Sequence, residues 1–208
     1  MPVSDDVIMD LIKKVNKLEQ DVNTLRSQKL FSPPTSFGTL RSFTMTTDNN
    51  GLTGFTLVDI FSPSALVLPP NIITQMRITF EAGSTEGFTI TNAYIGHGAV
   101  SGDAYDFTST PEQILFSGFA SVVIPAGGTV ASDSVFFSYN KINSLAIALY
   151  ANGGAASDMA RYVSGISNIS FYYKAATNEA ATVNKSAGYT LGTAGTNLSV
   201  NQIECNGF

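Results

Sequence analysis

The first thirty residues carry an apolar pattern that a lone helix in water cannot bury. Neither Gly nor Pro occurs between residues 5 and 29, and apolar residues recur at alternating spacings of three and four. With the first of them at heptad position a, β-branched residues fill every a position and leucines every d position: Ile8, Leu11, Val15, Leu18, Val22 and Leu25. Consecutive heptads of this kind are typical of a coiled coil. We therefore expect residues 1–30 to form a helix that oligomerises and anchors the protein.

The charges beside this stripe favour parallel helices. Lys14 at position g precedes Glu19 at the following e, and Asp21 precedes Arg26 in the same way. In parallel, in-register helices each g faces the next e of its neighbour, so both pairs are opposite in sign. The alternative is a single amphipathic helix that packs on the protein's own core. The a and d residues favour two strands, whereas a resemblance described below favours three.

The composition changes abruptly at Leu30. Residues 1–30 hold five of the 11 basic and five of the 16 acidic residues. Pro33 and Pro34 then end the helix, because a proline excludes the residue before it from the α region. We expect a Pro-Pro linker at 31–36, a β-domain at 37–174, and a C-terminal hairpin or subunit-docking tail at 175–208.

The β-domain is predicted from short runs with a two-residue period, separated by turn residues. In the run 75–80, for example, Met76, Ile78 and Phe80 share one face. Further strands are expected at 55–61, 65–68, 88–91, 120–124, 134–139, 145–149 and 169–173. The pair Asn50-Gly51 and the run 125–128 suit tight turns. The pattern predicts a mainly β protein, an antiparallel β-sandwich of jelly-roll-like type.

Composition favours a binding protein over an enzyme. The net charge of −5 and the pI near 4.7 argue against non-specific nucleic-acid binding, which needs clustered Lys and Arg. The single cysteine, Cys205, excludes an internal disulfide and is expected to be a free thiol. The single histidine, His97, excludes a multi-histidine metal centre. We expect no metal, no cofactor and no catalytic activity.

The sequence gives no sign of a membrane or secretory segment. No run reaches the roughly 18–20 apolar residues that a spanning helix needs. The N-terminus, Met1 to Asp6, is acidic and lacks a basic region followed by an apolar block. We expect no membrane insertion and no signal peptide, in a protein made in a cytoplasm.

The densest polar cluster of the β-domain is the glycine-rich run 96–106, with His97, Asp103, Tyr105 and Asp106. Carboxylates accept hydrogen bonds from sugar hydroxyls, and a tyrosine ring can stack on a pyranose. These four residues are the predicted ligand-binding site, and an ordinary surface loop is the alternative. Calcium binding, a glycosidase carboxylate pair and catalysis through the histidine have no supporting pattern.

The run 116–133, FSGFASVVIPAGGTVASD, resembles part of the β-sandwich domain that accompanies SGNH (GDSL-type) hydrolases. The runs 76–80, 93–96 and 145–150 are similar to other strands of that domain, and the resemblance spans 73–153. Those hydrolases also need a Gly-Asp-Ser block, which this chain lacks. The resemblance therefore implies a β-sandwich binding module without the catalytic part.

In layout, the heptad helix, the Pro-Pro break and the Ser-, Thr-, Asn- and Gly-rich β-domain resemble bacteriophage fibre and spike proteins. This resemblance implies a homotrimer located in a virion, partnered by other virion structural proteins, that attaches to cell-surface glycans. The alternative is a carbohydrate-binding accessory module of a hydrolase system, not itself catalytic.

Overall fold

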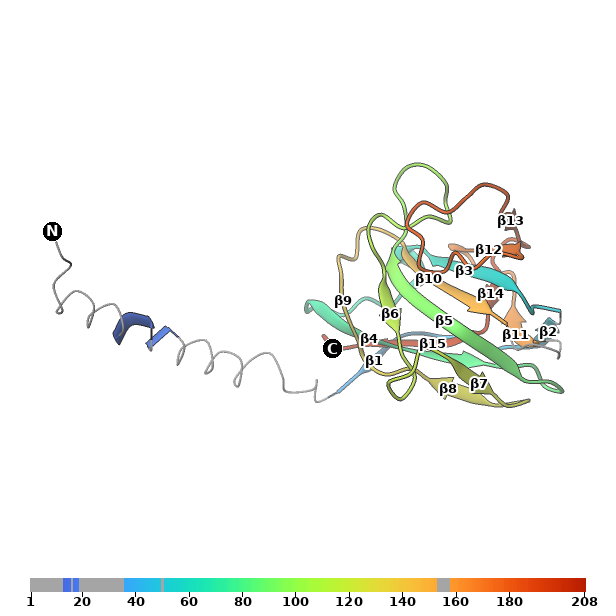
Figure 1. The fold of residues 1–208 in the computed structure, drawn as a ribbon, viewed down its shortest axis with the longest axis horizontal. Coiled ribbons are helices and arrows are strands. Elements are labelled where there is room, and N and C mark those ends of the chain that lie inside the picture. The colour runs from blue at the N-terminus through green and yellow to red at the C-terminus, as the bar shows by residue number, and fades with distance from the viewer. Residues whose placement is uncertain (1–12, 16, 19–35, 50, 153–157) are drawn as a thin grey trace, which may run out of the picture. The chain divides into compact units, whose positions relative to one another are not determined.

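The computed structural model describes residues 13–15, 17–18, 36–49, 51–152 and 158–208 (Figure 1). The chain divides into two units, residues 1–36 and 37–208. In the first unit the described residues 13–15 and 17–18 are helical, and Val15 and Leu18 are 48% and 68% exposed. The other predicted seam and flanking residues, apart from the helical Lys14, lie outside the described residues: Ile8, Leu11, Val22, Leu25, Glu19, Asp21 and Arg26. The coiled coil therefore stays a prediction.

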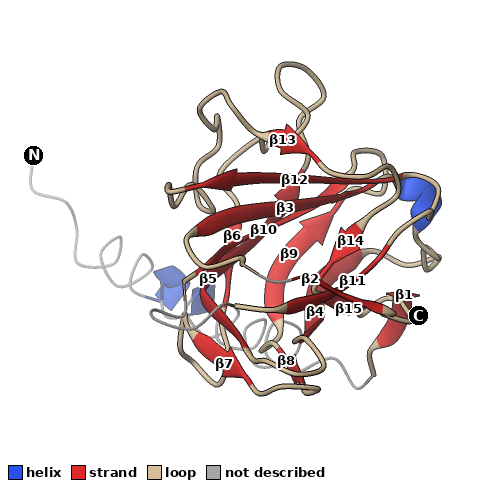
Figure 2. Ribbon diagram, turned by 90° about the vertical axis from the view of Figure 1, so that its right-hand side faces the viewer, coloured by secondary structure: helices blue, strands red, loops and turns tan. Residues whose placement is uncertain are grey.

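The second unit is mainly β, its strands pair antiparallel, and its architecture is consistent with a β-sandwich (Figures 1 and 2). The seven-stranded sheet contains β13 (Thr190–Leu191), β12 (Ile169–Ala175), β3 (Phe55–Phe61), β10 (Leu145–Ala151), β5 (Phe88–His97), β6 (Glu112–Ile114) and β7 (Val122–Ile124). The five-stranded sheet contains β1 (Gly38–Ser42), β15 (Val200–Cys205), β4 (Ile73–Glu81), β8 (Thr129–Ala131) and β9 (Val135–Tyr139). The three-stranded sheet contains β14 (Asn197–Leu198), β11 (Ala160–Val163) and β2 (Thr47–Asn49).

Most of the predicted strands coincide with observed ones, because the two-residue period places one apolar set against a core. The exception is the run 65–68, where the prediction is wrong. A single 3-10 turn, η1 (Pro63–Ala65), occupies its start. Pro69 and Pro70 follow, and a proline cannot donate to a strand ladder.

Both predicted turns join strands of different sheets rather than hairpin partners. The run 125–128 connects β7, which pairs with β5, to β8, which pairs with β4. Gly127 has a φ of 65° there, and its N–H donates to the Gly83 carbonyl at 2.6 Å. The strand before Asn50-Gly51, β2, pairs with β11 and not with the following β3. The turn at 125–128 is therefore a corner of the domain, whereas Asn50 lies outside the described residues.

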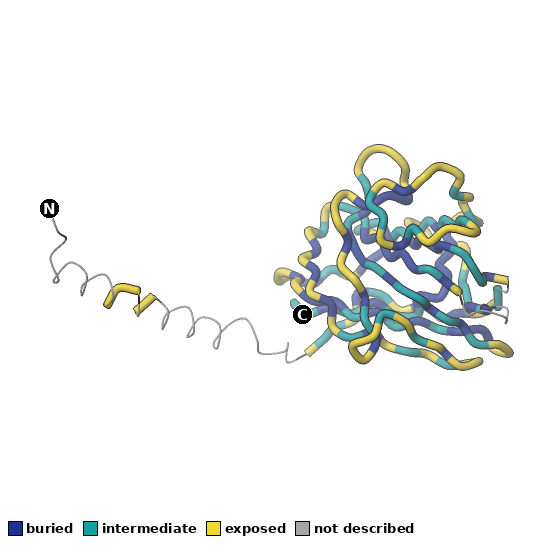
Figure 3. The backbone as a smooth tube through the Cα atoms, viewed as in Figure 1, coloured by how far each residue is buried: buried dark blue, intermediate teal, exposed yellow. Residues whose placement is uncertain are grey.

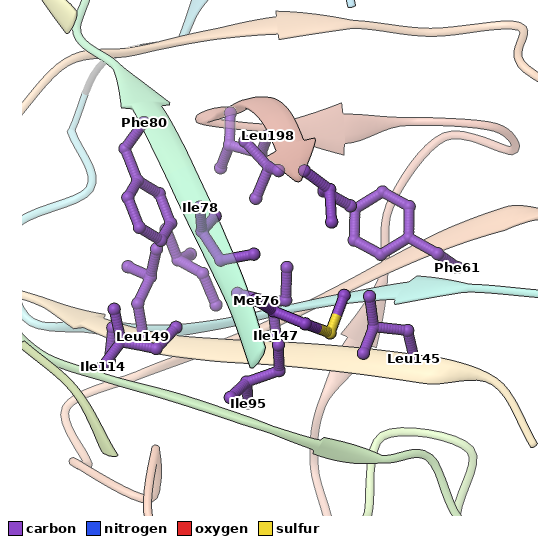
Figure 4. Close-up of a cluster of buried hydrophobic side chains, with 14 of the residues drawn as sticks. Phe61, Met76, Ile78, Phe80, Ile95, Ile114, Leu145, Ile147, Leu149 and Leu198 are labelled. Atoms are coloured by element: carbon purple, nitrogen blue, oxygen red, sulfur yellow. The ribbon is translucent and has the colours of Figure 1, made fainter. Parts of the chain in front are cut away.

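The main hydrophobic core contains side chains from both large sheets (Figure 4). Met76, Ile78 and Phe80 of β4 are fully buried in it, as are Ile95 of β5 and Phe61 of β3. Each such side chain stabilises the fold by about 1.5–3 kcal/mol relative to an exposed one. Buried residues lie along these strands, whereas exposed residues are concentrated in the connections between strands (Figure 3).

A second apolar cluster covers the other face of the seven-stranded sheet. It includes Val58, Tyr105, Phe107 and Ala180, together with two small residues of β10. β10 is consequently buried on both faces along nearly its whole length. The covering residues come from the run 99–108 and from the chain that follows β12.

The C-terminal residues differ from the expected hairpin or subunit-docking tail. β15 lies between β1 and β4 in the five-stranded sheet, and Ile203 is fully buried. Residues 175–208 are thus part of the β-domain itself. Ala180 in this segment is a buried member of the second cluster. Cys205 is a free, buried thiol, and burial raises its pKa to about 11.

A carboxyl group, that of Asp59, is buried within the β-domain on β3. Asp59 is 1% exposed, and its Oδ1 accepts a hydrogen bond from the Leu198 N–H at 3.1 Å. Burial raises its pKa well above the ordinary value, against the smaller lowering by that hydrogen bond. The folded protein therefore holds a proton that the unfolded chain releases near pH 4, so the free energy of unfolding falls as pH rises above this value.

We predict that Asp59→Asn stabilises the protein at neutral pH by roughly 1–3 kcal/mol, because the amide keeps the acceptor without ionising. Urea unfolding at pH 4.5 and pH 7.5 measures this. The gain over the unmodified protein should be larger at the higher pH, while Asp103→Asn, at an exposed carboxyl, should show no such gain. A D59N variant that is less stable than the unmodified protein at both values would contradict the account.

Candidate functional site

The predicted sugar-binding run 96–106 is folded back on the domain, with residues 100–104 exposed at its tip. Gly98 forms a bridge with Phe107. The Thr108 N–H donates to the His97 carbonyl at 2.9 Å, and the Ala99 N–H donates to the Asp106 carbonyl at 3.0 Å. These bonds close the run into a compact loop whose two ends lie side by side.

Tyr105 is covered by two other aromatic rings. It is 8% exposed, stacks on Tyr189 with centroids 4.4 Å apart, and meets Tyr172 edge-on at 5.6 Å. Its hydroxyl donates to Asp103 Oδ2 at 2.8 Å, and burial, helped by that carboxylate, raises its pKa to about 12. The geometry therefore does not fit the predicted stacking of a pyranose on this ring.

Asp106 is also buried and holds the C-terminal chain in place. Its Oδ1 accepts the Lys185 N–H at 2.7 Å. The Lys185 side chain is itself buried, with Nζ 3.8 Å from the centroid of the Phe107 ring, and burial lowers its pKa to about 8. Of the two predicted carboxylates only Asp103 is exposed. The loop thus fastens the chain beyond β12 to the sheet.

His97 is not brought together with Tyr105. His97 ends β5 and lies two residues after Ile95, so both side chains project from the sheet face that meets the main core. Tyr105 packs in the second cluster, on the other face. The imidazole lies against the rings of Phe137 and Tyr139, at 4.9 and 5.7 Å between centroids. Its neighbours are aromatic, and its role is packing between β5 and β9.

A pocket of about 390 Å³ lies elsewhere, between the three-stranded sheet and the β12 edge of the seven-stranded sheet. Its apolar wall contains the rings of Phe55, Tyr162, Phe171 and Tyr173. Phe171 and Tyr173 project from the same face of β12, nearly parallel at 20° and 5.7 Å apart, and Phe55 lies 6.2 Å from Tyr173. The alternation of β12 thus places two stacked rings side by side in one wall.

The remaining wall is rich in oxygen atoms. Asp48 and Asn49 of β2 contribute to it, with Thr193 and Thr196 from the chain between β13 and β14. Thr196 is 6% exposed, and its hydroxyl has no hydrogen-bond partner among the described residues. Gly192 also lines the pocket, and a Cβ at this position would lie 2.7 Å from a carbon of the Phe171 ring. Glycine is therefore required where the chain crosses this ring.

The Asp48 carboxylate is fixed by neighbours outside the pocket lining. The Ser84 N–H donates to Oδ1 at 3.0 Å, the Ser84 hydroxyl donates to Oδ2, and Arg161 Nε lies 3.4 Å from Oδ1. The hydrogen bonds from Ser84, assisted by the arginine charge, hold the pKa of Asp48 below its ordinary value. The carboxylate is therefore ionised at neutral pH, and it lies on the side of Ser84 and Arg161, because Asp48 is the direct cross-strand partner of Arg161 and not of the pocket-lining Tyr162.

The sequence showed only part of this pocket. The alternation along β12 places Tyr172 and Tyr173 on opposite faces. The first packs in the second cluster and the second beside the main core and the pocket. The other walls come from segments as distant as β2 and the chain after β13. No spacing in the sequence links these segments, because only the tertiary fold makes them adjacent.

Among the described residues, no group of three or more His, Cys, Asp or Glu is placed to hold a metal ion. None of the described helices is both long and apolar enough to cross a membrane. Comparison with models of protein families and with curated proteins finds no match to this sequence.

We predict that His97 titrates below its ordinary pKa of about 6.5. Its Nε2 accepts the Asn140 N–H at 3.1 Å, which a protonated ring cannot do, and burial lowers its pKa. Because the unfolded chain takes up the proton first as pH falls below about 6.5, the free energy of unfolding should fall with it.

The single histidine gives one C2–H resonance, so an NMR titration reads this pKa directly. The urea-unfolded chain is the reference, and His97→Gln, whose amide oxygen can still accept, should lose this part of the pH dependence. A midpoint at or above that of the unfolded chain would show the prediction to be wrong.

Proposed function

We propose that the protein is an oligomeric adhesive protein of a virion, of the fibre, spike or head-decoration kind. In this proposal a jelly-roll-like β-sandwich head binds cell-surface glycans, and the N-terminal helix joins the chains and attaches them to other virion proteins. The observation that carries the binding function is the pocket beside β12, with its stacked rings on one wall and oxygen atoms on the other.

This combination suits a saccharide. A pyranose has apolar C–H faces that pack on aromatic rings and a rim of hydroxyl groups that need hydrogen-bond partners. Tyr173, which is only partly buried, offers a ring face, while Asn49 and Thr193 offer polar atoms. The volume of about 390 Å³ lies in the range of small-ligand pockets.

Oligomerisation would compensate for a weak single site. A small open pocket binds a monosaccharide weakly, but linked sites engage a surface with much higher avidity without any new contact. The support is the heptad pattern of residues 8–25, together with the exposure of Val15 and Leu18 on the described helical residues. Apolar side chains at a and d positions are stable in water only when another helix covers them.

One end of the β-domain is also suited to contact with a second copy. Ile72 and Ile142 are 79% and 80% exposed, and the C-terminal Phe208 is 51% exposed. They lie at the end where the described β-domain begins, because Ile73 pairs with Tyr139 and Gly38 pairs with Cys205. A parallel bundle of the preceding helices would hold these same ends of neighbouring heads together, where their apolar side chains could pack.

We predict that the full-length protein is a trimer in solution and that Leu11→Asp/Leu18→Asp converts it to a monomer. Two buried carboxylates per helix would each need to be desolvated in the seam. Light scattering gives the mass, and Lys13→Gln, at position f away from the seam and from both charge pairs, is the control. A chain starting at Phe31 should also be monomeric. A monomeric full-length protein would contradict the proposal and favour the accessory carbohydrate-binding module instead.

We also predict that Tyr173→Leu weakens glycan binding about tenfold or more, because leucine keeps apolar volume but removes the ring face. The full-length protein is applied to an immobilised glycan panel, and affinities for the captured glycans follow from calorimetry. Tyr172→Leu, on the opposite face of the same strand, is the matched control and should bind normally. Asp103→Asn separates this pocket from the loop 96–106; a loss of binding there, with Tyr173→Leu unaffected, would place the site in the loop.

A further inference from the structure

The segment 192–198 forms part of the pocket wall and is bonded to the seven-stranded sheet at both of its ends. At its start, the Gly192 N–H donates to the Phe171 carbonyl of β12 at 2.8 Å. At its end, the Leu198 N–H donates to Asp59 Oδ1 of β3 at 3.1 Å. The pocket-lining threonines lie between these two attachments. One attachment is therefore made by backbone atoms, and the other depends on a single side chain.

The Asp59 side chain also adjoins the opposite wall of the pocket. Asp59 is the direct cross-strand partner of Phe171, whose ring lines the pocket, and direct partners project from the same face of a sheet. Its hydrogen bond to Leu198 joins β3 to β14, which belongs to the three-stranded sheet. One buried carboxyl group thus links the two sheets between which the pocket lies.

The end of this segment makes few other polar contacts with the seven-stranded sheet. Thr196 Oγ1, Asn197 Oδ1 and Ser199 Oγ are buried without a hydrogen-bond partner among the residues that the structure describes. β14 is two residues long, and its ladder partner is β11 of its own sheet. Buried polar groups without partners disfavour the arrangement that buries them. The closed position of the segment is therefore sensitive to the loss of the Asp59 hydrogen bond.

The Asp59 carboxyl is compatible with this closed position only without its charge. Among the described residues of β10, β12 and β14, no charged side chain faces it: its direct partners are Ile147 and Phe171, and β14 contributes Leu198. Burial raises its pKa, and the Leu198 hydrogen bond opposes this only in part. An ionised carboxylate needs water, which reaches this place only when the segment moves away from the sheet.

From this arrangement we infer that Asp59 is a positioning residue of the pocket, and that its protonated carboxyl holds the segment 192–198 where a glycan can bind. This inference rests on the proposed glycan-binding function and adds a dependence on pH to it. Asp59 does not line the pocket and acts through the two walls that it joins. Ionisation favours the open arrangement, so the affinity for glycan falls as pH rises, in proportion to the fraction of closed pocket.

The affinity for a neutral glycan at two pH values tests this inference. The full-length protein is titrated by calorimetry with an uncharged glycan retained on the panel, so that the ligand itself does not ionise. We expect the affinity to fall about tenfold or more from pH 5 to pH 8. Asp59→Asn keeps an acceptor that cannot ionise, so its affinity should change less than threefold. Asp103→Asn, at an exposed carboxyl, is the matched control and should keep the pH dependence of the unmodified protein.

Hydrogen exchange tests the positioning without any glycan. In the unmodified protein the protection factor of the Leu198 amide should fall about tenfold between pH 5 and pH 8, because the segment opens locally. The Leu149 amide in the central strand β10 is the internal reference and should keep its protection. In Asp59→Asn both amides should keep theirs.

The outcomes separate this inference from the proposed function. An affinity that does not change with pH, while Tyr173→Leu still weakens binding, overturns the inference and leaves the proposed function intact. Binding of no glycan at either pH overturns the proposed function. Equal protection of the Leu198 amide at both pH values then overturns the positioning role as well.

Discussion

Burial of the central strands on both faces is the constraint on which this domain depends. Most sheets of a sandwich need cover on one face only, but β10 is apolar on both, and its outward-facing residues are the small Ala146 and Ala148. The five-stranded sheet covers one face. The other is covered by the loop 99–108 and the chain after β12, through Tyr105, Phe107 and Ala180. This cover is irregular chain, so its position depends on specific side-chain contacts.

Those contacts explain why the polar loop is structural. Irregular chain laid on an apolar face must satisfy its own backbone groups. Asp106 does so by accepting the Lys185 N–H, and Phe107 does so by donating to the Val183 carbonyl. Asp106, Tyr105 and Lys185 are residue types that often form functional sites. Here they join two loops over the sheet instead. The pocket lies on the opposite face of the sheet from this cover, where Phe171 and Tyr173 of β12 project.

The regular parts of the fold were predictable because their signal is local. In β4 and β12 the alternation of Met76, Ile78 and Phe80, and of Tyr172 and Tyr173, follows from the pleat alone. The sheet membership of β15 was not predictable, since it pairs with β1 across the whole length of the domain. The same holds for the pocket. Asp48 and Thr196 are far apart in the sequence, and neither stands in a motif.

The residues predicted in the loop 96–106 are not brought together, for the opposite reason. Its residues cluster in sequence, but the strand ending at His97 faces one side of the sheet and Tyr105 the other, so sequence proximity does not become a common surface. The pocket rings come from strands whose alternate residues build the core, so rigid packing positions Tyr173 and Phe171. A weak ligand site on such a scaffold loses little entropy when it binds. This rigidity, multiplied by the parallel copies of the proposed oligomer, would suit the proposed adhesive function.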